Sequence, residues 1–164
     1  MKEASTVVAF VCLAMVMVLA QHSHEDHDMN QRGERGMGFS QQKTAHHFLL
    51  AKDGGAIQVT AKSADDKASI EQIRHHLKYI RNSFQSGQFD IPMFVHNQTP
   101  PGVPVMTHAA DKIRYRYEEE ENGGKVVIST DDKEALAAVH DFLRFQIKEH
   151  KTGDPLEVQS QSNK

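Results

Sequence analysis

The stretch that decides the fold runs from residue 44 to residue 61 and reads TAHHFLLAKDGGAIQVTA. Runs rich in apolar residues on both sides of Asp53-Gly54-Gly55 predict two strands, Thr44–Ala51 and Ala56–Ala61. Asp and Gly are typical turn residues, so the strands are expected to join through a tight turn. Ser63 and Asp65-Asp66 follow and could cap a helix over Lys67–Gln85.

The same order of elements returns later in the chain. Residues 112–130 read KIRYRYEEEENGGKVVIST. They predict strands over Lys112–Glu118 and Lys125–Thr130 around a turn at Glu121-Asn122-Gly123-Gly124. Asp131 or Asp132 would then cap a second helix that reaches about His150.

The two units align with each other, GGAIQV at 54–59 over GGKVVI at 123–128. Each expected helix has an apolar stripe at the spacing of one helix face. The stripes are Ile73, Leu77, Ile80 and Phe84, and Leu136, Val139, Leu143 and Ile147. The expected fold class is α+β, a pseudo-symmetric ββα-ββα repeat with a four-stranded antiparallel sheet and two helices on one face. The alternative is a chance likeness between two common hairpin–helix units.

The ends of the chain lack this pattern. Residues 1–20 have a basic start and an apolar run over 7–20, too short to span a bilayer. This is typical of a signal peptide cleaved after Ala20, with a buried core helix as the alternative. Residues 21–38, rich in histidine, and residues 153–164 are expected to be disordered tails. One domain remains over 39–152, with a long Pro-rich loop over 86–111. We expect a periplasmic or secreted protein with no stable membrane insertion after cleavage.

Composition limits the function classes. The 164 residues have a formal net charge of -3, with 11 histidines, one cysteine and no tryptophan. Cys12 lies in the expected signal peptide, so the mature domain would have no disulfide or thiolate ligand. No basic face indicates a nucleic-acid partner. No nucleophile elbow or phosphate loop is present. We therefore expect a non-catalytic protein, with a histidine-dependent hydrolase or lyase as the weaker alternative.

Histidine and methionine supply the main candidate chemistry. Imidazole suits copper and zinc, and a thioether suits Cu(I). Adjacent strand residues face opposite sides of a sheet, so only one of His46 and His47 would point inward. We expect an exported metal-binding domain, with copper favoured and zinc as the other candidate ion. The candidate ligands are His46, His47, His76, His96, Met106, His108 and His140.

A binding or interaction module without metal is the alternative function. Its contacts with a small molecule or a partner protein would come from the loop over 86–111 and the open face of the sheet. That face is expected to carry a mixed set of side chains: Gln58, Thr60, Arg114, Arg116 and Val127. A solvated face is the simpler interpretation of this set, and a homodimer formed face to face is the other.

Several motifs resemble a family of small exported bacterial proteins of unassigned function. They are Phe39-Ser40-Gln41, His46-His47-Phe48, Gly54-Gly55, Ile73-Arg74-His75-His76-Leu77, Pro100-Pro101-Gly102-Val103-Pro104-Val105-Met106 and His140-Asp141-Phe142-Leu143-Arg144-Phe145-Gln146. The resemblance covers Met37 to Asp154 and implies a bacterial source and a periplasmic location, without catalytic residues. Some members are labelled aspartate carbamoyltransferase. This chain does not fit that label, because it is too short and lacks a Ser-Thr-Arg-Thr phosphate loop.

Overall fold

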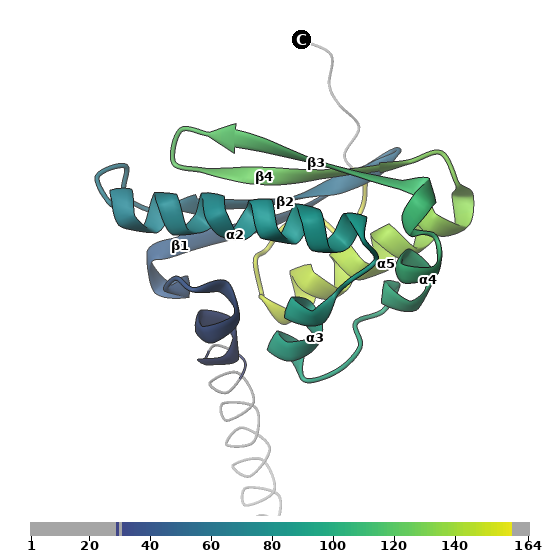
Figure 1. The fold of residues 1–164 in the computed structure, drawn as a ribbon, viewed down its shortest axis with the longest axis horizontal. Coiled ribbons are helices and arrows are strands. Elements are labelled where there is room, and N and C mark those ends of the chain that lie inside the picture. Colours follow the sequence, from purple (N-terminus) through teal and green to yellow (C-terminus); the bar gives the residue numbers. More distant parts are fainter. Residues whose placement is uncertain (1–28, 30, 159–164) are drawn as a thin grey trace, which may run out of the picture.

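The computed structural model describes residue 29 and residues 31–158. Figure 1 shows the elements, which follow the chain in the order β1 (Thr44–Ala51), β2 (Gly54–Ala61), α2 (Lys67–Gln85), α3 (Asp90–His96), α4 (Val103–His108), β3 (Ile113–Glu120), β4 (Gly123–Thr130) and α5 (Lys133–Glu149). Short 3-10 helices, Gln41–Lys43 and Ala110–Lys112, precede β1 and β3. The predicted α+β class is confirmed, and the element order is consistent with a ββα-ββα arrangement.

The strands form one antiparallel sheet in the order β1-β2-β4-β3. Each half of the chain makes a hairpin, and the two halves meet where β2 pairs with β4. Ile57 lies opposite Val126 at the centre of this pairing. Two residues to one side of this centre Gly55 pairs with Ile128, and two residues to the other side Val59 pairs with Gly124. Each pair therefore joins a glycine to a β-branched residue, with the two strands exchanged. The register therefore has the pseudo-twofold symmetry that the two aligned units suggest.

Glycines at the start of β2 and β4 let these two strands pair closely. A Cβ atom on Gly123 would lie 2.1 Å from the carbonyl oxygen of Val59. A Cβ atom on Gly54 would lie 2.0 Å from the carbonyl oxygen of Ile128, and Gly54 also has a φ of 151°. Both contacts are far shorter than real Cβ atoms allow, so the central pairing requires glycine at these positions.

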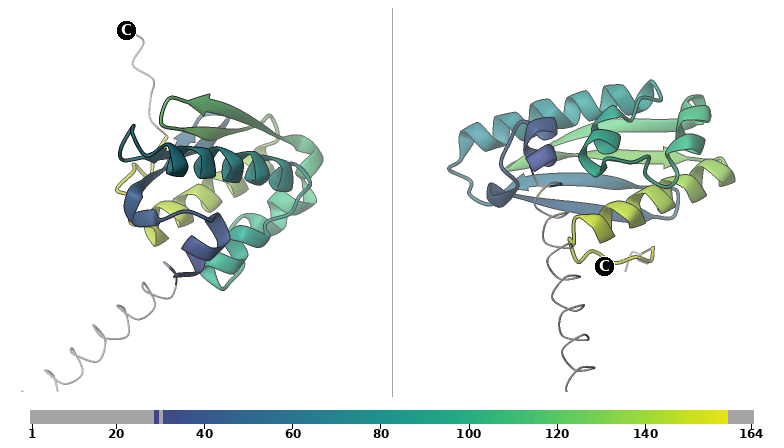
Figure 2. Two further views of the ribbon diagram at one scale, coloured as in Figure 1. Left: turned by 60° about the vertical axis from the view of Figure 1, so that its left-hand side comes forward. Right: turned by 90° about the horizontal axis from the view of Figure 1, so that it is seen from below.

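Both long helices cover the same face of the sheet, as Figure 2 shows. α2 packs on β2, β3 and β4, and α5 packs on β1, β2 and β4. The Asp66 carboxylate caps α2 by accepting a hydrogen bond from the Ser69 N–H at 3.1 Å. Asp132 caps α5 by accepting from the N–H groups of Glu134 and Ala135. The predicted apolar stripes are buried except at Leu136, which is only partly buried while its neighbour Ala135 is buried instead; Ile73 and Leu143 are 0% exposed.

Side chains cover parts of both edges of the sheet. On β3, Gln85 donates to the Ile113 carbonyl and accepts from the Tyr115 N–H. On β1, the Asp154 carboxylate accepts from the Phe48 N–H at 2.9 Å. Unpaired backbone N–H and C=O groups on an edge strand can form hydrogen bonds with a strand of another chain. These contacts therefore reduce the tendency of the protein to aggregate through its edges.

The loop and the tails contain more structure than their composition predicts. The Pro-rich segment over 86–111 contains α3 and α4, and its Phe89, Val103 and Met106 join the main core. Residues 31–37 are helical rather than disordered. Arg32 Nε donates to the Val95 carbonyl at 2.9 Å, so contact with α3 stabilises a segment that has no apolar period of its own.

The remaining predicted segments fall at the ends of the chain. At the C-terminal end, Asp154 anchors the start of the predicted tail to β1. The expected signal peptide and half of the histidine-rich tail, including its three histidines, lie outside the described residues. In the part of the chain that the structure describes, no helix combines the length and the apolar character needed to cross a membrane.

Replacing Gly123 by alanine should destabilise the fold by about 1–3 kcal/mol, because the new Cβ atom would push β4 away from Val59. Urea unfolding of Gly123→Ala measures this loss. Gly36→Ala is the matched control, since its Cβ atom would meet Phe94 at an ordinary 3.4 Å. Equal stability of the two variants would contradict the role given to the central glycines.

Candidate functional site

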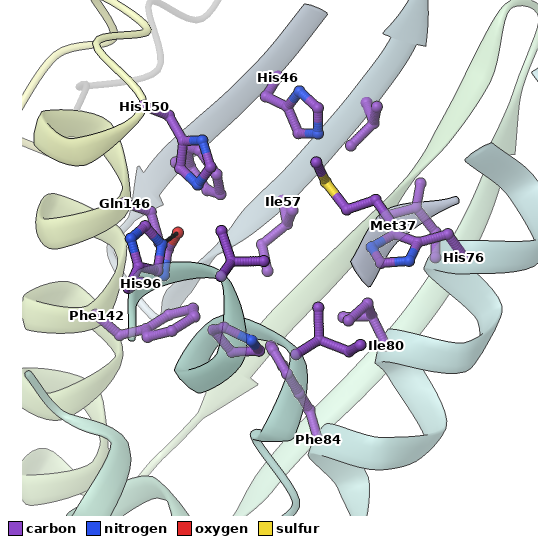
Figure 3. A pocket seen from close by; sticks show the side chains of 16 residues that line it. Met37, His46, Ile57, His76, Ile80, Phe84, His96, Phe142, Gln146 and His150 are labelled. Carbon is purple, nitrogen blue, oxygen red and sulfur yellow. Dashed lines mark hydrogen bonds between the residues drawn. The ribbon is translucent and has the colours of Figure 1, made fainter. Parts of the chain in front are cut away.

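A narrow cavity lies between α2 and α5 on the covered face of the sheet (Figure 3). The space open to the centres of water molecules is about 60 Å³. Its walls are mainly apolar: Phe48, Ile57, Val59, Leu77, Ile80, Phe84, Ile91, Pro92, Val95 and Phe142. The remaining lining residues are Met37, Gln146 and four histidines. An apolar space with a few polar groups aimed into it is the usual form of a ligand site.

The four histidines come from four separate segments. His46 lies on β1 and His76 on α2, while His96 ends α3 and His150 caps the C-terminus of α5. His46 shares a strand face with buried Phe48, because residues two apart on a strand point the same way. The sequence left open which of His46 and His47 faces inward, and the structure selects His46.

Contacts between rings connect the histidines. The His150 ring lies 5.9 Å from the His46 ring, in a parallel stack, and 5.1 Å from the His96 ring. Phe39 stacks on His46 at 5.9 Å and meets the edge of His76 at 5.5 Å. The four imidazoles therefore form one continuous cluster together with Phe39. We call His46, His76, His96 and His150 the cavity histidines.

Burial keeps the cavity histidines neutral. It lowers the pKa of His46 to about 4, with a further contribution from His47, and that of His76 to about 4, with contributions from His46 and His75. Burial and the neighbouring histidines lower the pKa of His150 to about 3. Burial also lowers the pKa of His96, against the opposing effects of Gln146 and Glu149. Neutral imidazoles keep a nitrogen lone pair that can accept a hydrogen bond or bind a metal.

Within the described residues, buried nitrogen atoms of this cluster lack hydrogen-bond partners. His96 Nε2 donates to Gln146 Oε1 at 3.0 Å, which leaves the lone pair on His96 Nδ1. Within residues 29 and 31–158 that Nδ1 atom has no hydrogen-bond partner, and Glu149 Oε2 is 4.0 Å away. His46 Nε2 and Gln146 Nε2 are also buried without a hydrogen-bond partner in the part of the chain that the structure describes. Such groups cost about 1–3 kcal/mol each when nothing satisfies them, so a ligand at this position would recover part of that cost.

The structure separates the seven ligands predicted from the sequence. His46, His76 and His96 line the cavity. His47 points away, with its Nδ1 atom 2.8 Å from Asp154 Oδ1. The other three do not line the cavity. The Nε2 atom of His140 lies within hydrogen-bond distance of the carbonyls of Ala51 and Gly54. Met106 is 0% exposed in the core, and His108 is exposed on α4.

Met37, Gln146 and His150 are cavity residues that the sequence analysis missed. Met37 was assigned to the tail. His150 was taken only as a terminal residue of the second helix. Its position, one turn beyond Gln146 and two beyond Phe142, continues the buried face of that helix and could have identified it.

The described residues do not assemble a metal site of the usual kind, with three or more His, Cys, Asp or Glu ligands. In residues 29 and 31–158, no group of three or more His, Cys, Asp or Glu side chains is arranged to hold a metal ion. Met37 adds a thioether, a ligand type suited to Cu(I). Figure 3 shows the Met37 side chain pointing into the cavity toward His46.

In comparisons with known proteins, no family model, curated protein or solved structure matches this chain. The resemblance to small exported bacterial proteins therefore stays a prediction.

Acid should destabilise the protein through the cavity histidines. Histidine titrates near pH 6.5 when unfolded, whereas His46, His76 and His150 titrate near 4, 4 and 3 when folded. Between these values the unfolded state binds more protons, so the free energy of unfolding falls as pH falls from about 6.5 toward 4. Each histidine contributes up to about 1.4 kcal/mol per pH unit. Urea unfolding at pH 7.5, 5.5 and 4.5 measures the decline.

The variant His150→Phe should make this decline less steep, because it keeps an aromatic ring beside Phe48 and removes the group with the lowest pKa. His75→Gln is the control, since His75 is exposed on α2 outside the cavity. The same pH dependence in the original chain and in His150→Phe would contradict the assignment.

Proposed function

We propose that this chain is an exported, periplasmic metal-binding protein that holds copper through His and Met side chains at the cavity between α2 and α5. The observation that most supports this is the convergence of four neutral imidazoles and one thioether on a single narrow space. Both ligand types suit copper. The expected signal peptide over residues 1–20 is the basis for the proposed location.

His46 and Met37 are the first ligands in this proposal. Among the described residues His46 Nε2 is buried without a hydrogen-bond partner, so the tautomer with its proton on Nδ1 can bind an ion without breaking an existing contact. Met37 lines the same cavity, with its side chain pointing toward His46 (Figure 3). His76 is the third candidate, because Phe39 contacts both its ring and that of His46. His96 and His150 complete the cluster on the side of α5.

Binding should be coupled to stability. A ligand that binds only the native state raises the free energy of unfolding by mass action. Here the ion would also supply a partner for a buried nitrogen atom that otherwise has none. Copper should therefore raise the melting temperature, and it should do so through cavity residues rather than through surface histidines.

The test is an anaerobic Cu(I) titration against a competing chelator, with a melting curve at each point. The background chain carries Cys12→Ala, His22→Ala, His24→Ala and His27→Ala, which removes the thiol and the imidazoles before Met29. We expect one ion per chain and a rise in melting temperature. His46→Ala should weaken binding by at least about tenfold.

Two surface histidines provide matched controls for this titration. His75→Ala on α2 and His108→Ala on α4 alter exposed imidazoles outside the cavity, and should leave affinity unchanged. Cu(I) binding that is insensitive to His46→Ala would refute the proposed site.

A second candidate function is the binding of a small molecule without metal. One observation favours it: α3, from the Pro-rich segment, supplies Ile91, Pro92 and Val95 to the cavity wall. A small apolar molecule with one hydrogen-bond donor would suit the lone pair of His46 or His96. Melting-temperature shifts with such compounds, together with no response to copper, would favour this function.

A further inference from the structure

The charge of the cavity limits which ion it can take, an inference that rests on the proposed function above. Among the described residues that line the cavity, none is Asp, Glu or Cys. An imidazole binds a metal ion in its neutral form, and a thioether carries no charge. The ligands would therefore leave the full charge of the ion uncompensated.

Charged groups near the cluster do little to change this. Glu149 Oε2 lies 4.0 Å from His96 Nδ1, but its side chain is 41% exposed and does not line the cavity. Arg32 brings a positive charge to the same region, since its Nε atom donates to the carbonyl of Val95, a lining residue, at 2.9 Å. An ion at His46 and Met37 would thus have no anionic ligand among the described lining residues.

Removing an ion from water costs free energy that rises with the square of its charge. The cost is already large for a single charge in an apolar interior, and it is four times larger for a double charge in the same continuum treatment. Proteins normally compensate buried charges by pairing them with opposite charges. An apolar cavity with neutral ligands therefore penalises a divalent ion far more than a monovalent one.

Ligand number and space favour the same kind of ion. Zn²⁺ in proteins is usually held in tetrahedral geometry, with three or four protein ligands. The residues that the structure describes include no group of three or more His, Cys, Asp or Glu side chains placed to hold an ion. The cavity leaves about 60 Å³ for the centres of water molecules, which is enough for a few waters but not for a full hydration shell.

We infer that the cavity selects a soft monovalent cation, Cu(I) or its analogue Ag(I), over Cu(II) and Zn(II), and that the Met37 thioether is the discriminating ligand. Met37 is the last of the helical residues 31–37, which contact α3 through the hydrogen bond from Arg32 to Val95. Met37 and His46 both line the cavity, and in Figure 3 the Met37 side chain points toward the His46 ring. Sulfur of this kind binds soft ions in preference to hard ones.

The test compares Ag(I), Zn(II) and Cu(II) on the background chain defined above, by calorimetric titration and melting curves in chloride-free buffer. Ag(I) serves as the monovalent probe because it does not change oxidation state under these conditions. We expect Ag(I) to bind once per chain and to raise the melting temperature. Zn(II) and Cu(II) should bind more weakly by on the order of a hundredfold.

Two substitutions at one position test the thioether. Met37→Leu keeps the side-chain volume and should weaken Ag(I) binding by at least about tenfold. Met37→His replaces the sulfur ligand by a nitrogen ligand, and should reduce the difference between the binding affinities for Ag(I) and Zn(II). Met93→Leu is the matched control, because Met93 is 39% exposed on α3 and lies outside the cavity lining. Urea unfolding of each variant confirms that the fold is retained.

The outcomes distinguish the proposed metal site from its proposed selectivity for monovalent ions. Zn(II) binding as tight as Ag(I) binding, with both lost in His46→Ala, would overturn the selectivity and leave the metal site in place. Ag(I) affinity unchanged by Met37→Leu would overturn the role of the thioether. Failure of Cu(I), Ag(I), Zn(II) and Cu(II) alike to bind would overturn the proposed function itself.

Discussion

The antiparallel pairing of β2 with β4 is the contact on which the rest of this structure depends. It joins two hairpin–helix units that each bury only one side of a two-stranded ribbon, and such a ribbon is at best marginally stable alone. Joined through Ile57 and Val126, the units form one sheet whose covered face both helices can share. The glycines that start β2 and β4 are needed because backbone atoms of the opposite strand occupy the positions of their absent Cβ atoms.

The same pairing creates the cavity. It places β1 and α2 of the first unit near α5 of the second, so that His46, His76 and His150 meet although they are far apart in sequence. The segment between the units then adds α3 and His96. The cluster has a cost for the apo protein, because neutral imidazoles with unpaired nitrogen atoms sit in an apolar environment. A core chosen for stability alone would place apolar side chains at these positions, which is why the cluster supports a binding role.

Much of the fold could be predicted from local patterns. The strand at Thr44–Ala51 and the helix at Lys67–Gln85 have the predicted bounds, because period, turn residues and caps agree there. The order of the strands could not be predicted, since it depends on how the two units dock. The helices in the Pro-rich segment were missed because α3 and α4 are short and depend on packing against the rest of the fold.

The candidate site was predicted only in part, for a related reason. Residue type and strand alternation were enough to propose His46, His76 and His96 as ligands. They could not exclude Met106, which has the same chemistry as Met37 but is buried in the core. His140 was equally plausible, and the structure places its Nε2 atom beside backbone carbonyls of the first hairpin. Only tertiary structure distinguishes a histidine that faces a cavity from one that holds a turn.

Nuclear magnetic resonance of the imidazole groups during Cu(I) addition tests the central claim most directly, because Cu(I) is diamagnetic and each ring reports separately. The account predicts that one equivalent of Cu(I) shifts the ring signals of His46 and its cluster neighbours His76, His96 and His150. The signals of His75, His108 and His140 should stay in place. Shifts confined to histidines outside the cavity, or no shift at one equivalent, would contradict it.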